Sequence, residues 1–167
     1  MLKDEVALSK EKMKKIDLKL IARSVVDDFN NIYEAKRGII IELIDNNNLE
    51  EYFINGIENR IEQIIANLLD NSISFSDDNQ KILVEISRNR EKKTSLKVVD
   101  QGKGFKEKNT DKIFNRFYSN RPDKFGEHSG LGLNIVKNLV DLHGATINAS
   151  NNITKKGANV EIVFPKS

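Results

Sequence analysis

Apolar residues in this chain follow the period of a helix in some segments and that of a strand in others, and the order of the segments restricts the fold. Helical spacing predicts helices over residues 18–36 and 57–75 and a third that ends near His143, with Gly38 and Gly144 ending the first and the third. Strand-like runs occupy residues 39–44, 52–55, 81–88, 95–100, 145–152 and 157–165. The chain therefore predicts one domain in the order helix, two strands, helix, hairpin, long polar segment, helix and hairpin.

Composition excludes several classes of protein. The 167 residues carry a net charge of +2, which gives no strong attraction to nucleic acid or to an anionic membrane. The chain has no cysteine and only two histidines, which excludes a disulfide framework, disfavours a zinc centre and fits a reducing cytoplasm. Its longest apolar runs fall far short of the ~20 residues that span a bilayer, and its N-terminus is too charged for a signal peptide. We expect a cytoplasmic location for this part of the protein.

A long polar segment runs from Gln101 to His128, between two predicted elements. Segments longer than about 12 to 15 residues without secondary structure are usually lids or binding loops in a compact domain. At its start, the sequence DQGKG places Asp100 at the end of a strand, before Gly102 and Gly104. Such a carboxylate can accept a hydrogen bond from an exocyclic amine such as adenine N6, and glycines let a flat ring approach the backbone. The same residue types also form ordinary turns.

Two asparagines and two later motifs supply further candidate ligands. Asn67 and Asn71 lie four residues apart on one helical face, so Asn71 can offer an oxygen to Mg²⁺; solvated or capping amides are the alternative. The sequence FNRFYS can pin a lid through its aromatic residues while Arg116 faces phosphate, or it can form only a small hydrophobic anchor. In HSGLGL, Gly130 and Gly132 stand at a helix start, where they can hold phosphate or form a tight turn.

The four motifs occur in one order, each on the element that its chemistry needs, which makes coincidence a poor explanation. Together they closely resemble the catalytic, ATP-binding domain of sensor histidine kinases, in the wider ATPase group (GHKL) shared with gyrase, Hsp90 and MutL. NLLDNSISFS resembles the N box, DQGKG the G1 box, FNRFY the F box and HSGLGL the G2 box.

The resemblance covers residues 16–165 and implies a fold and a domain organisation. The implied fold is α+β, a two-layer α/β sandwich (Bergerat fold) with a mixed sheet of about five strands packed under three helices. An ATP lid would span about residues 101–129. Residues 1–16 would be a helical remnant that leads from a missing dimerisation domain into the catalytic domain, residues 17–167.

The resemblance also implies a role for each motif residue. Asp100 would bind adenine N6, and Asn71 would ligate the Mg²⁺ that bridges the phosphates. The lid would close and contact a partner helical domain through Phe114 and its neighbours. The implied ATP-binding residues are Asn71, Ser74, Phe75, Asp100, Gly102, Gly104, Phe117, Tyr118, Ser129, Gly130, Leu131, Gly132 and Leu133. The implied catalytic residues are Asn67, Arg116 and Arg121.

Several positions depart from the family pattern. Hydrolysing relatives carry a glutamate general base where this chain has Asn67, which cannot readily take a proton from water, so phosphoryl transfer is favoured over hydrolysis. Ser74 and Ser119 stand where many such kinases carry Lys and Arg, and Arg121 or Arg116 is expected to supply the missing charge. The threonine usual in the last hairpin is absent from GANVEIVF, which leaves its contact on the adenine side open.

The resemblance implies a function and its partners. The chain would bind Mg-ATP and donate the γ-phosphoryl group to a histidine on a separate dimerisation domain, for relay to an aspartate of a response regulator. Neither His128 nor His143 has an acceptor-like helical context, so we expect this segment alone not to phosphorylate itself on histidine. The full protein is expected to be a membrane-anchored homodimer. The sequences NSISFS, FYSNRP and FGEHSGLGL together resemble the ChvG-like envelope-stress sensors of alphaproteobacteria. The alternatives are an anti-sigma factor of the serine kinase type and an ATP-hydrolysing clamp.

Overall fold

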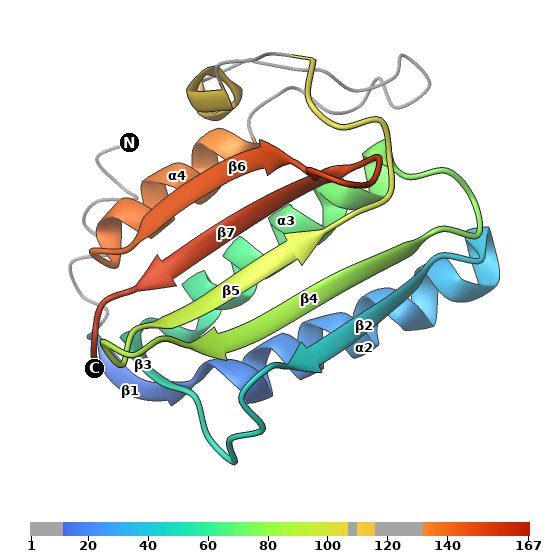
Figure 1. The fold of residues 1–167 in the computed structure, drawn as a ribbon. Coiled ribbons are helices and arrows are strands. Elements are labelled where there is room, and N and C mark those ends of the chain that lie inside the picture. Colours follow the sequence, from blue (N-terminus) through green and yellow to red (C-terminus); the bar gives the residue numbers. More distant parts are fainter. Residues whose placement is uncertain (1–11, 107–109, 116–131) are drawn as a thin grey trace.

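A computed structural model describes residues 12–106, 110–115 and 132–167, and its main element is a sheet of five strands. The strands lie in the order β2-β4-β5-β7-β6, with the bounds Ile40–Asp45, Lys81–Arg88, Thr94–Val99, Ala158–Phe164 and Thr146–Asn151. β2 pairs with β4 in parallel and the other neighbours are antiparallel, so the sheet is mixed. The helices α2 (Leu18–Arg37), α3 (Glu58–Phe75) and α4 (Gly132–Leu142) cover one face (Figure 1). The predicted two-layer α+β architecture is confirmed.

A second, two-stranded sheet corrects the prediction for the N-terminus. It consists of β1 (Lys14–Asp17) and β3 (Phe53–Gly56), which pair antiparallel. The helical remnant predicted over residues 1–16 is therefore wrong for residues 14–16, because pairing with a strand distant in sequence overrides local helical preference. Residues 1–11 lie outside the described residues.

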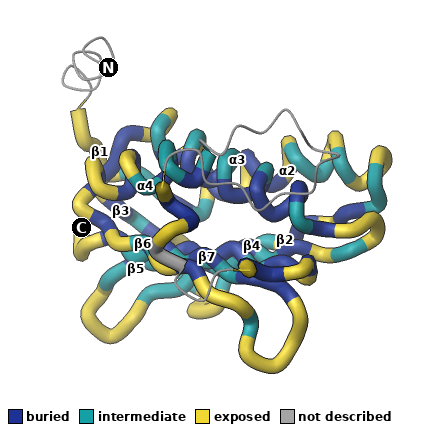
Figure 2. The backbone as a smooth tube through the Cα atoms, turned by 90° about the horizontal axis from the view of Figure 1, so that it is seen from above, coloured by how far each residue is buried: buried dark blue, intermediate teal, exposed yellow. Residues whose placement is uncertain are grey.

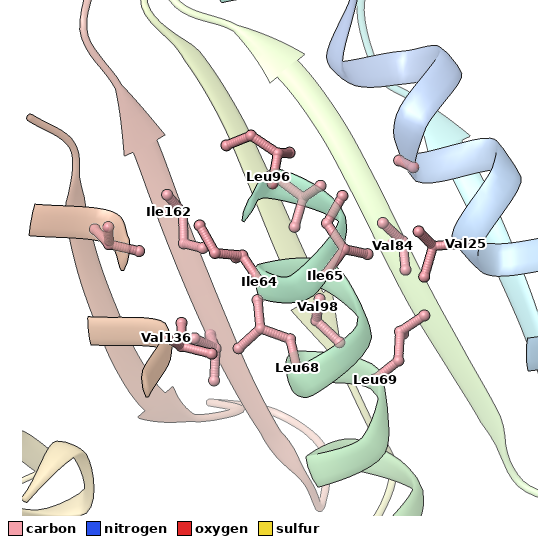
Figure 3. Packing of buried hydrophobic residues seen from close by; sticks show 14 of the residues in the cluster. Val25, Ile64, Ile65, Leu68, Leu69, Val84, Leu96, Val98, Val136 and Ile162 are labelled. Atoms are coloured by element: carbon pink, nitrogen blue, oxygen red, sulfur yellow. The ribbon is translucent and has the colours of Figure 1, made fainter. Parts of the chain in front are cut away.

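The hydrophobic core lies between the sheet and the helices, and α3 runs through its middle (Figure 3). The stripe predicted on α3 is buried, with an exposed fraction of at most 1% at Ile61, Ile64, Ile65, Leu68 and Leu69. Alternate strand residues meet it, among them Val84, Leu96, Val98 and Ile162. The intervening strand residues are only partly buried, so the helices cover a single face of the sheet (Figure 2). Although α3 is rich in apolar residues, no helix among the described residues is long and apolar enough to cross a membrane.

A side chain of α2 covers part of the free edge of strand β2. The Asn30 amide Nδ2 donates to the Ile41 carbonyl oxygen at 2.9 Å, and the Ile41 N–H donates to Asn30 Oδ1 at 2.9 Å. One amide thus replaces the two hydrogen bonds that a neighbouring strand would make to Ile41. Such cover protects an edge from pairing with another chain.

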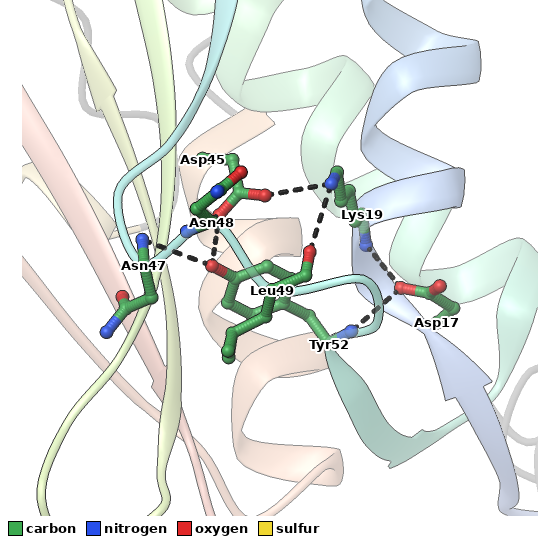
Figure 4. A network of polar contacts seen from close by, with 7 residues as sticks. All are labelled: Asp17, Lys19, Asp45, Asn47, Asn48, Leu49 and Tyr52. Atoms are coloured by element: carbon green, nitrogen blue, oxygen red, sulfur yellow. Dashed lines mark hydrogen bonds and ion pairs between the residues drawn. The ribbon is translucent and has the colours of Figure 1, made fainter.

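Polar side chains join the end of β2 to β3 and to the start of α2 (Figure 4). Asp45 Oδ2 forms an ion pair with Lys19 Nζ at 2.8 Å, and Asp45 also accepts a hydrogen bond from the Tyr52 hydroxyl. Asp17 Oδ1 accepts the backbone N–H groups of Lys19 at 3.0 Å and Tyr52 at 3.1 Å, which caps α2. Burial alone would raise the pKa of Asp45, but the hydrogen bonds from Lys19 and Tyr52 outweigh it and hold this pKa at about 2.

One buried histidine joins α3 to α4. His143 directly follows α4 and is 5% exposed. Its Nε2 accepts the Ile57 N–H at 3.1 Å, and its Nδ1 lies 2.7 Å from the Leu139 carbonyl oxygen. Both ring nitrogens are therefore engaged inside the fold.

Candidate functional site

Asp100 directly follows β5 and is only 4% exposed. Its backbone N–H donates to the Ala158 carbonyl oxygen at 2.9 Å, which continues the pairing of β5 with β7. Its side-chain Oδ1 accepts two backbone hydrogen bonds, from Gly102 at 2.9 Å and from Ala158 at 3.1 Å. Oδ2 receives no hydrogen bond from the described residues, so this oxygen is available to a donor from a ligand.

Burial raises the pKa of the Asp100 carboxyl group, because desolvation disfavours the ionised form. The hydrogen bonds from Gly102 and Ala158 act in the opposite direction but do not outweigh burial. Within residues 12–106, 110–115 and 132–167, no lysine or arginine forms an ion pair with Asp100. A buried carboxylate with a perturbed pKa and no cation beside it is a candidate ligand-binding group.

Close contacts require the two glycines that follow Asp100. A Cβ atom at Gly102 would lie 2.3 Å from the Phe75 carbonyl oxygen, at the end of α3. At Gly104, where φ is +80°, a Cβ atom would lie 2.6 Å from Asn151 Oδ1. The loop therefore passes tightly between the ends of α3 and β6. That its glycines also admit a flat ring stays a prediction.

The last turns of α3 carry the predicted N-box residues. Asn71 is 4% exposed and Ser74 is 2% exposed, whereas Asn67, one turn earlier than Asn71, is half-buried. The Ser74 hydroxyl donates to the Asn71 carbonyl oxygen at 2.6 Å. The rings of Phe75 and Phe105 meet edge-on with their centroids 6.0 Å apart, which joins the end of α3 to the loop after Asp100.

Arg37, the last residue of α2, fixes the end of α3. Its guanidinium donates to the carbonyl oxygens of Ile73 at 3.0 Å and Ser76 at 2.7 Å, and it forms an ion pair with Asp78 at 2.7 Å. The last carbonyl groups of a helix have no partner within the helix, and a cation there also interacts favourably with the helix dipole. The position of the N-box residues is therefore set from α2.

The structure places only part of the predicted site. Phe75 contacts the loop after Asp100, and Asn71 and Ser74 lie within one turn of Phe75 on α3. Gly132 and Leu133 begin α4. The predicted residues Arg116, Phe117, Tyr118, Arg121, Ser129, Gly130 and Leu131 lie outside the described residues, as does most of the lid predicted at 101–129.

Phe114, in the predicted F box, ends a short 3₁₀ helix, Thr110–Phe114. Phe114 is 8% exposed and belongs to the hydrophobic core. Its carbonyl oxygen accepts a hydrogen bond from Asn134 Nδ2 of α4 at 3.2 Å. Phe114 is thus anchored in the core. A lid pin and a small hydrophobic anchor both require this burial, so the role of the F box stays a prediction.

Sequence reasoning missed the residues that hold Asp100 from the turn between β6 and β7. The Asn152 amide donates to the Asp100 carbonyl oxygen at 3.1 Å, and the Ala158 N–H donates to its carboxylate. Ala158 begins the strand in which the expected threonine is absent, and its backbone takes part in the contact with Asp100. The local signal was slight: two asparagines before a loop that contains Gly157, which is typical of any turn.

A metal at this site would depend on few protein ligands. Among the described residues, no group of three or more His, Cys, Asp or Glu side chains is placed to hold a metal ion. Mg²⁺ commonly takes one or two protein oxygens together with phosphate oxygens and water. The predicted ligand Asn71 is compatible with that mode of binding.

Comparison with known proteins identifies the relatives of this chain. The family of histidine kinase-, DNA gyrase B-, and HSP90-like ATPases matches residues 56–167. The sensor protein ChvG of Rhizobium meliloti is 33% identical over 159 residues, which cover 92% of this chain and 27% of that protein. The sensor protein kinase PmrB of Pseudomonas aeruginosa is 31% identical over 118 residues, which cover 71% of this chain and 24% of that protein. The chain therefore spans about a quarter of the length of these curated relatives.

Solved structures share the fold. The catalytic domain of histidine kinase ThkA has a TM-score of 0.79 at 24% identity, covering 93% of this chain and 96% of that one. Full-length ShkA in complex with AMPPNP has a TM-score of 0.77 at 22% identity, covering 93% of this chain and 31% of that one. ThkA in complex with the response regulator protein TrrA has a TM-score of 0.75 at 22% identity, covering 99% of this chain and 46% of that one.

Proposed function

Because this chain belongs to the family of histidine kinase-, DNA gyrase B-, and HSP90-like ATPases, we propose that it binds Mg-ATP and donates the γ-phosphoryl group to a histidine on a separate dimerisation domain. An aspartate of a response regulator then receives the phosphoryl group. The observation that carries the proposal is the buried Asp100 carboxylate, whose Oδ1 is fixed by two backbone N–H groups while Oδ2 receives no hydrogen bond from the described residues.

The Asp100 carboxylate fits an adenine base. Oδ2 can accept the exocyclic N6 amine, which guanine and hypoxanthine replace with an oxygen that an ionised carboxylate repels. A donor from the base would restore the solvation that burial removes from Asp100. Binding should therefore lower the raised pKa of this carboxyl group.

Asn71 is the residue that would hold Mg²⁺. Its side chain is buried near the end of α3, where Arg37 holds the carbonyl oxygens of Ile73 and Ser76. Mg²⁺, when bound, neutralises negative charge on the phosphates. Ser74 does not replace the lysine common in such kinases, because it carries no charge and donates its hydroxyl hydrogen to the Asn71 carbonyl oxygen.

Asn67 supports transfer rather than hydrolysis. An amide cannot take a proton from water, so the chain lacks the general base that hydrolysing relatives place at this position. Catalysis would then consist of positioning and electrostatic stabilisation, while the acceptor histidine supplies the nucleophile. Arg116 and Arg121 remain the predicted sources of positive charge near the transferred group.

The acceptor histidine would belong to another domain. His143 is buried with both ring nitrogens engaged, which makes it unsuitable as an acceptor, and His128 lies outside the described residues. The matched relatives are about 3 to 3.5 times as long as this chain, which leaves room for a dimerisation domain and a membrane anchor in the full protein. We propose that the chain is the cytoplasmic catalytic portion of such a homodimer. The ThkA–TrrA complex and the ShkA–AMPPNP complex support a response regulator and a nucleotide as its partners.

Two measurements test the proposal. Titration calorimetry of the purified chain should show Mg²⁺-dependent binding of ATP and weaker binding of inosine triphosphate, which lacks the N6 amine. Incubation with γ-labelled ATP and the dimerisation domain of the same kinase should label that domain on histidine and leave this chain unlabelled. Replacement of the acceptor histidine is the control, because it should abolish the label without changing ATP affinity.

Other outcomes would favour the alternatives. Label on a serine of a regulatory protein would indicate the anti-sigma factor class. Sustained phosphate release that disappears in Asn67→Ala, while ATP binding persists, would indicate an ATP-hydrolysing clamp. A stable phosphohistidine on this chain alone would contradict the need for a separate acceptor domain.

A further inference from the structure

Two consecutive asparagines at the end of β6 reach the loop that follows Asp100. The turn from β6 to β7 runs beside the segment after β5 (Figure 1). The Asn151 amide Nδ2 donates to the Phe105 carbonyl oxygen at 3.0 Å, and the Phe105 N–H donates to Asn151 Oδ1 at 2.6 Å. One side chain thus holds both backbone groups of Phe105, at the far end of the loop from Asp100.

The Asn152 amide holds the near end of the loop. Its Nδ2 donates to the Asp100 carbonyl oxygen at 3.1 Å, with a longer contact of 3.4 Å to the Lys156 carbonyl oxygen. A chain of donors sets its orientation: the Ser150 hydroxyl donates to Asn159 Oδ1 at 3.1 Å, and Asn159 Nδ2 donates to Asn152 Oδ1 at 3.1 Å. Because its oxygen accepts from Asn159, Asn152 presents its N–H group to Asp100.

The backbone of the turn packs against the same carbonyl group. Gly157 is buried with φ at +120°, and a Cβ atom there would lie 2.1 Å from the Asp100 carbonyl oxygen. The Gly157 carbonyl oxygen also accepts the Asn152 N–H at 2.9 Å. The turn is therefore built to contact Asp100, and only glycine fits at this position.

We propose that Asn151 and Asn152 are positioning residues, which hold the loop from Asp100 to Phe105 so that Asp100 Oδ2 meets the amine of the base. The inference rests on the proposed function, since it assumes that Asp100 binds adenine. Hydrogen bonds weaken steeply when donor and acceptor are misaligned. The direction of the carboxylate depends on this loop, because Oδ1 accepts the N–H of Gly102 within it.

Asn30 offers a matched control in the same sheet. Its amide makes the same pair of hydrogen bonds, to both backbone groups of Ile41 on the opposite edge strand. Asn30→Ala therefore removes as many hydrogen bonds as Asn151→Ala, on the edge strand farthest from β6. A loss of stability is common to both substitutions, whereas a change in ligand selection is specific to the asparagines at the turn.

The test compares ATP with inosine triphosphate. Titration calorimetry measures both affinities for the wild type, Asn151→Ala, Asn152→Ala and Asn30→Ala, at a temperature where circular dichroism shows each to be folded. We expect ATP affinity to fall about tenfold in Asn152→Ala, as for the loss of one well-placed hydrogen bond. The affinity for inosine triphosphate should change much less, so the preference for ATP shrinks. Asn151→Ala should act in the same direction, while Asn30→Ala lowers the melting temperature and leaves the preference unchanged.

An unchanged preference for ATP in both turn variants, or an equal loss in Asn30→Ala, overturns the inference. Should Asn152→Ala fail to fold, Asn151→Ala decides, because it releases the Phe105 end of the same loop and leaves Asn152 in place. A wild-type chain that binds the two nucleotides equally overturns the proposed function and this inference with it. If the wild type prefers ATP and the two turn variants prefer it as strongly, the inference is overturned but the proposed function is not.

Discussion

Asp45 and Asp100 are two carboxylates at opposite ends of the sheet, and their surroundings shift their pKa values in opposite directions. Asp45 ends β2 and is compensated by the Lys19 ammonium and the Tyr52 hydroxyl, which hold its pKa at about 2. Asp100 follows β5, and among the described residues its carboxylate accepts hydrogen bonds only from backbone N–H groups, while burial raises its pKa. A carboxylate that pairs with a cation and a hydroxyl of its own chain stabilises the fold. A buried carboxylate without a cation beside it is stabilised most by a hydrogen-bond donor from a ligand.

Replacing Asp100 should give the largest effect on ligand binding. Asp100→Asn removes a charged acceptor but keeps the shape of the side chain, so we expect ATP affinity to fall about 100-fold, as for the loss of a hydrogen bond to a charged group. The free energy of unfolding should not fall, because the substitution removes a desolvated charge. Calorimetry with ATP and urea unfolding measure the two quantities. Unchanged ATP affinity would contradict the adenine assignment and remove the contrast between the carboxylates.

Replacing Asp45 should give the opposite pattern. We expect Asp45→Asn to lower the free energy of unfolding by about 2 kcal/mol at pH 7, from the difference between the folded pKa of about 2 and the unfolded value of 3.8. ATP affinity should stay unchanged. The lowered pKa means that the contribution of Asp45 is present above pH 3.8 and is lost as the pH falls through about 2. Urea unfolding of wild type and variant should therefore converge in strong acid, and a constant difference would argue against the ion pair as its source.

The two carboxylates should also respond to pH in opposite directions. The pKa of Asp100 is raised above 3.8, so its proton stabilises the folded state, and that contribution is lost as the pH rises from 3.8 through the raised pKa. Ionised Asp100 is the form that accepts the amine, so ATP affinity should fall on acidification by up to about tenfold per pH unit below the raised pKa. Calorimetry on Asp100→Asn under the same conditions subtracts the titration of ATP itself. Parallel pH profiles for wild type and variant would show that Asp100 does not bind the base.

The smallest expected effect concerns the hydroxyl that compensates Asp45. Tyr52→Phe keeps the ring that packs under the Arg88 guanidinium, 5.6 Å from the ring centroid. It removes the hydroxyl, which donates to Asp45 and accepts the Asn47 N–H at 3.3 Å. We expect a loss of about 1 kcal/mol in the free energy of unfolding, mostly from the hydrogen bond to Asp45, because the contact from Asn47 is long. Combining it with Asp45→Asn in a double-mutant cycle should give less than the sum of the single effects, because both remove the same contact. Additive losses would show that the hydroxyl acts elsewhere.

Periodicity in the sequence predicts most of the fold because the core needs apolar residues on one helix face and on alternate strand positions. The buried stripe of α3 and the paired strands β4 and β5 follow this rule closely. Strand β1 does not, since the short sequence KKID has no apolar alternation of its own. It becomes a strand only by pairing with β3, which lies far away in sequence.

The candidate site likewise has one part that could be predicted from the sequence and one part that could not. The motifs around Asn71 and Asp100 are local in sequence and could be predicted from residue types and order. The contacts that hold Asp100 from the turn are not local, because Phe105 pairs with Asn151 across 46 positions and Asp100 with Ala158 across 58. They depend on where strand register brings two asparagines, and residue types alone do not encode that.

The buried His143 ring makes the docking of α3 against α4 visible to nuclear magnetic resonance. Because the Ile57 N–H donates to Nε2, the Nδ1 atom must carry the hydrogen that faces the Leu139 carbonyl oxygen. The ring is thus locked as one tautomer, whose two nitrogens resonate at well-separated ¹⁵N frequencies. Averaging of these two signals would report separation of the helices from a single labelled side chain.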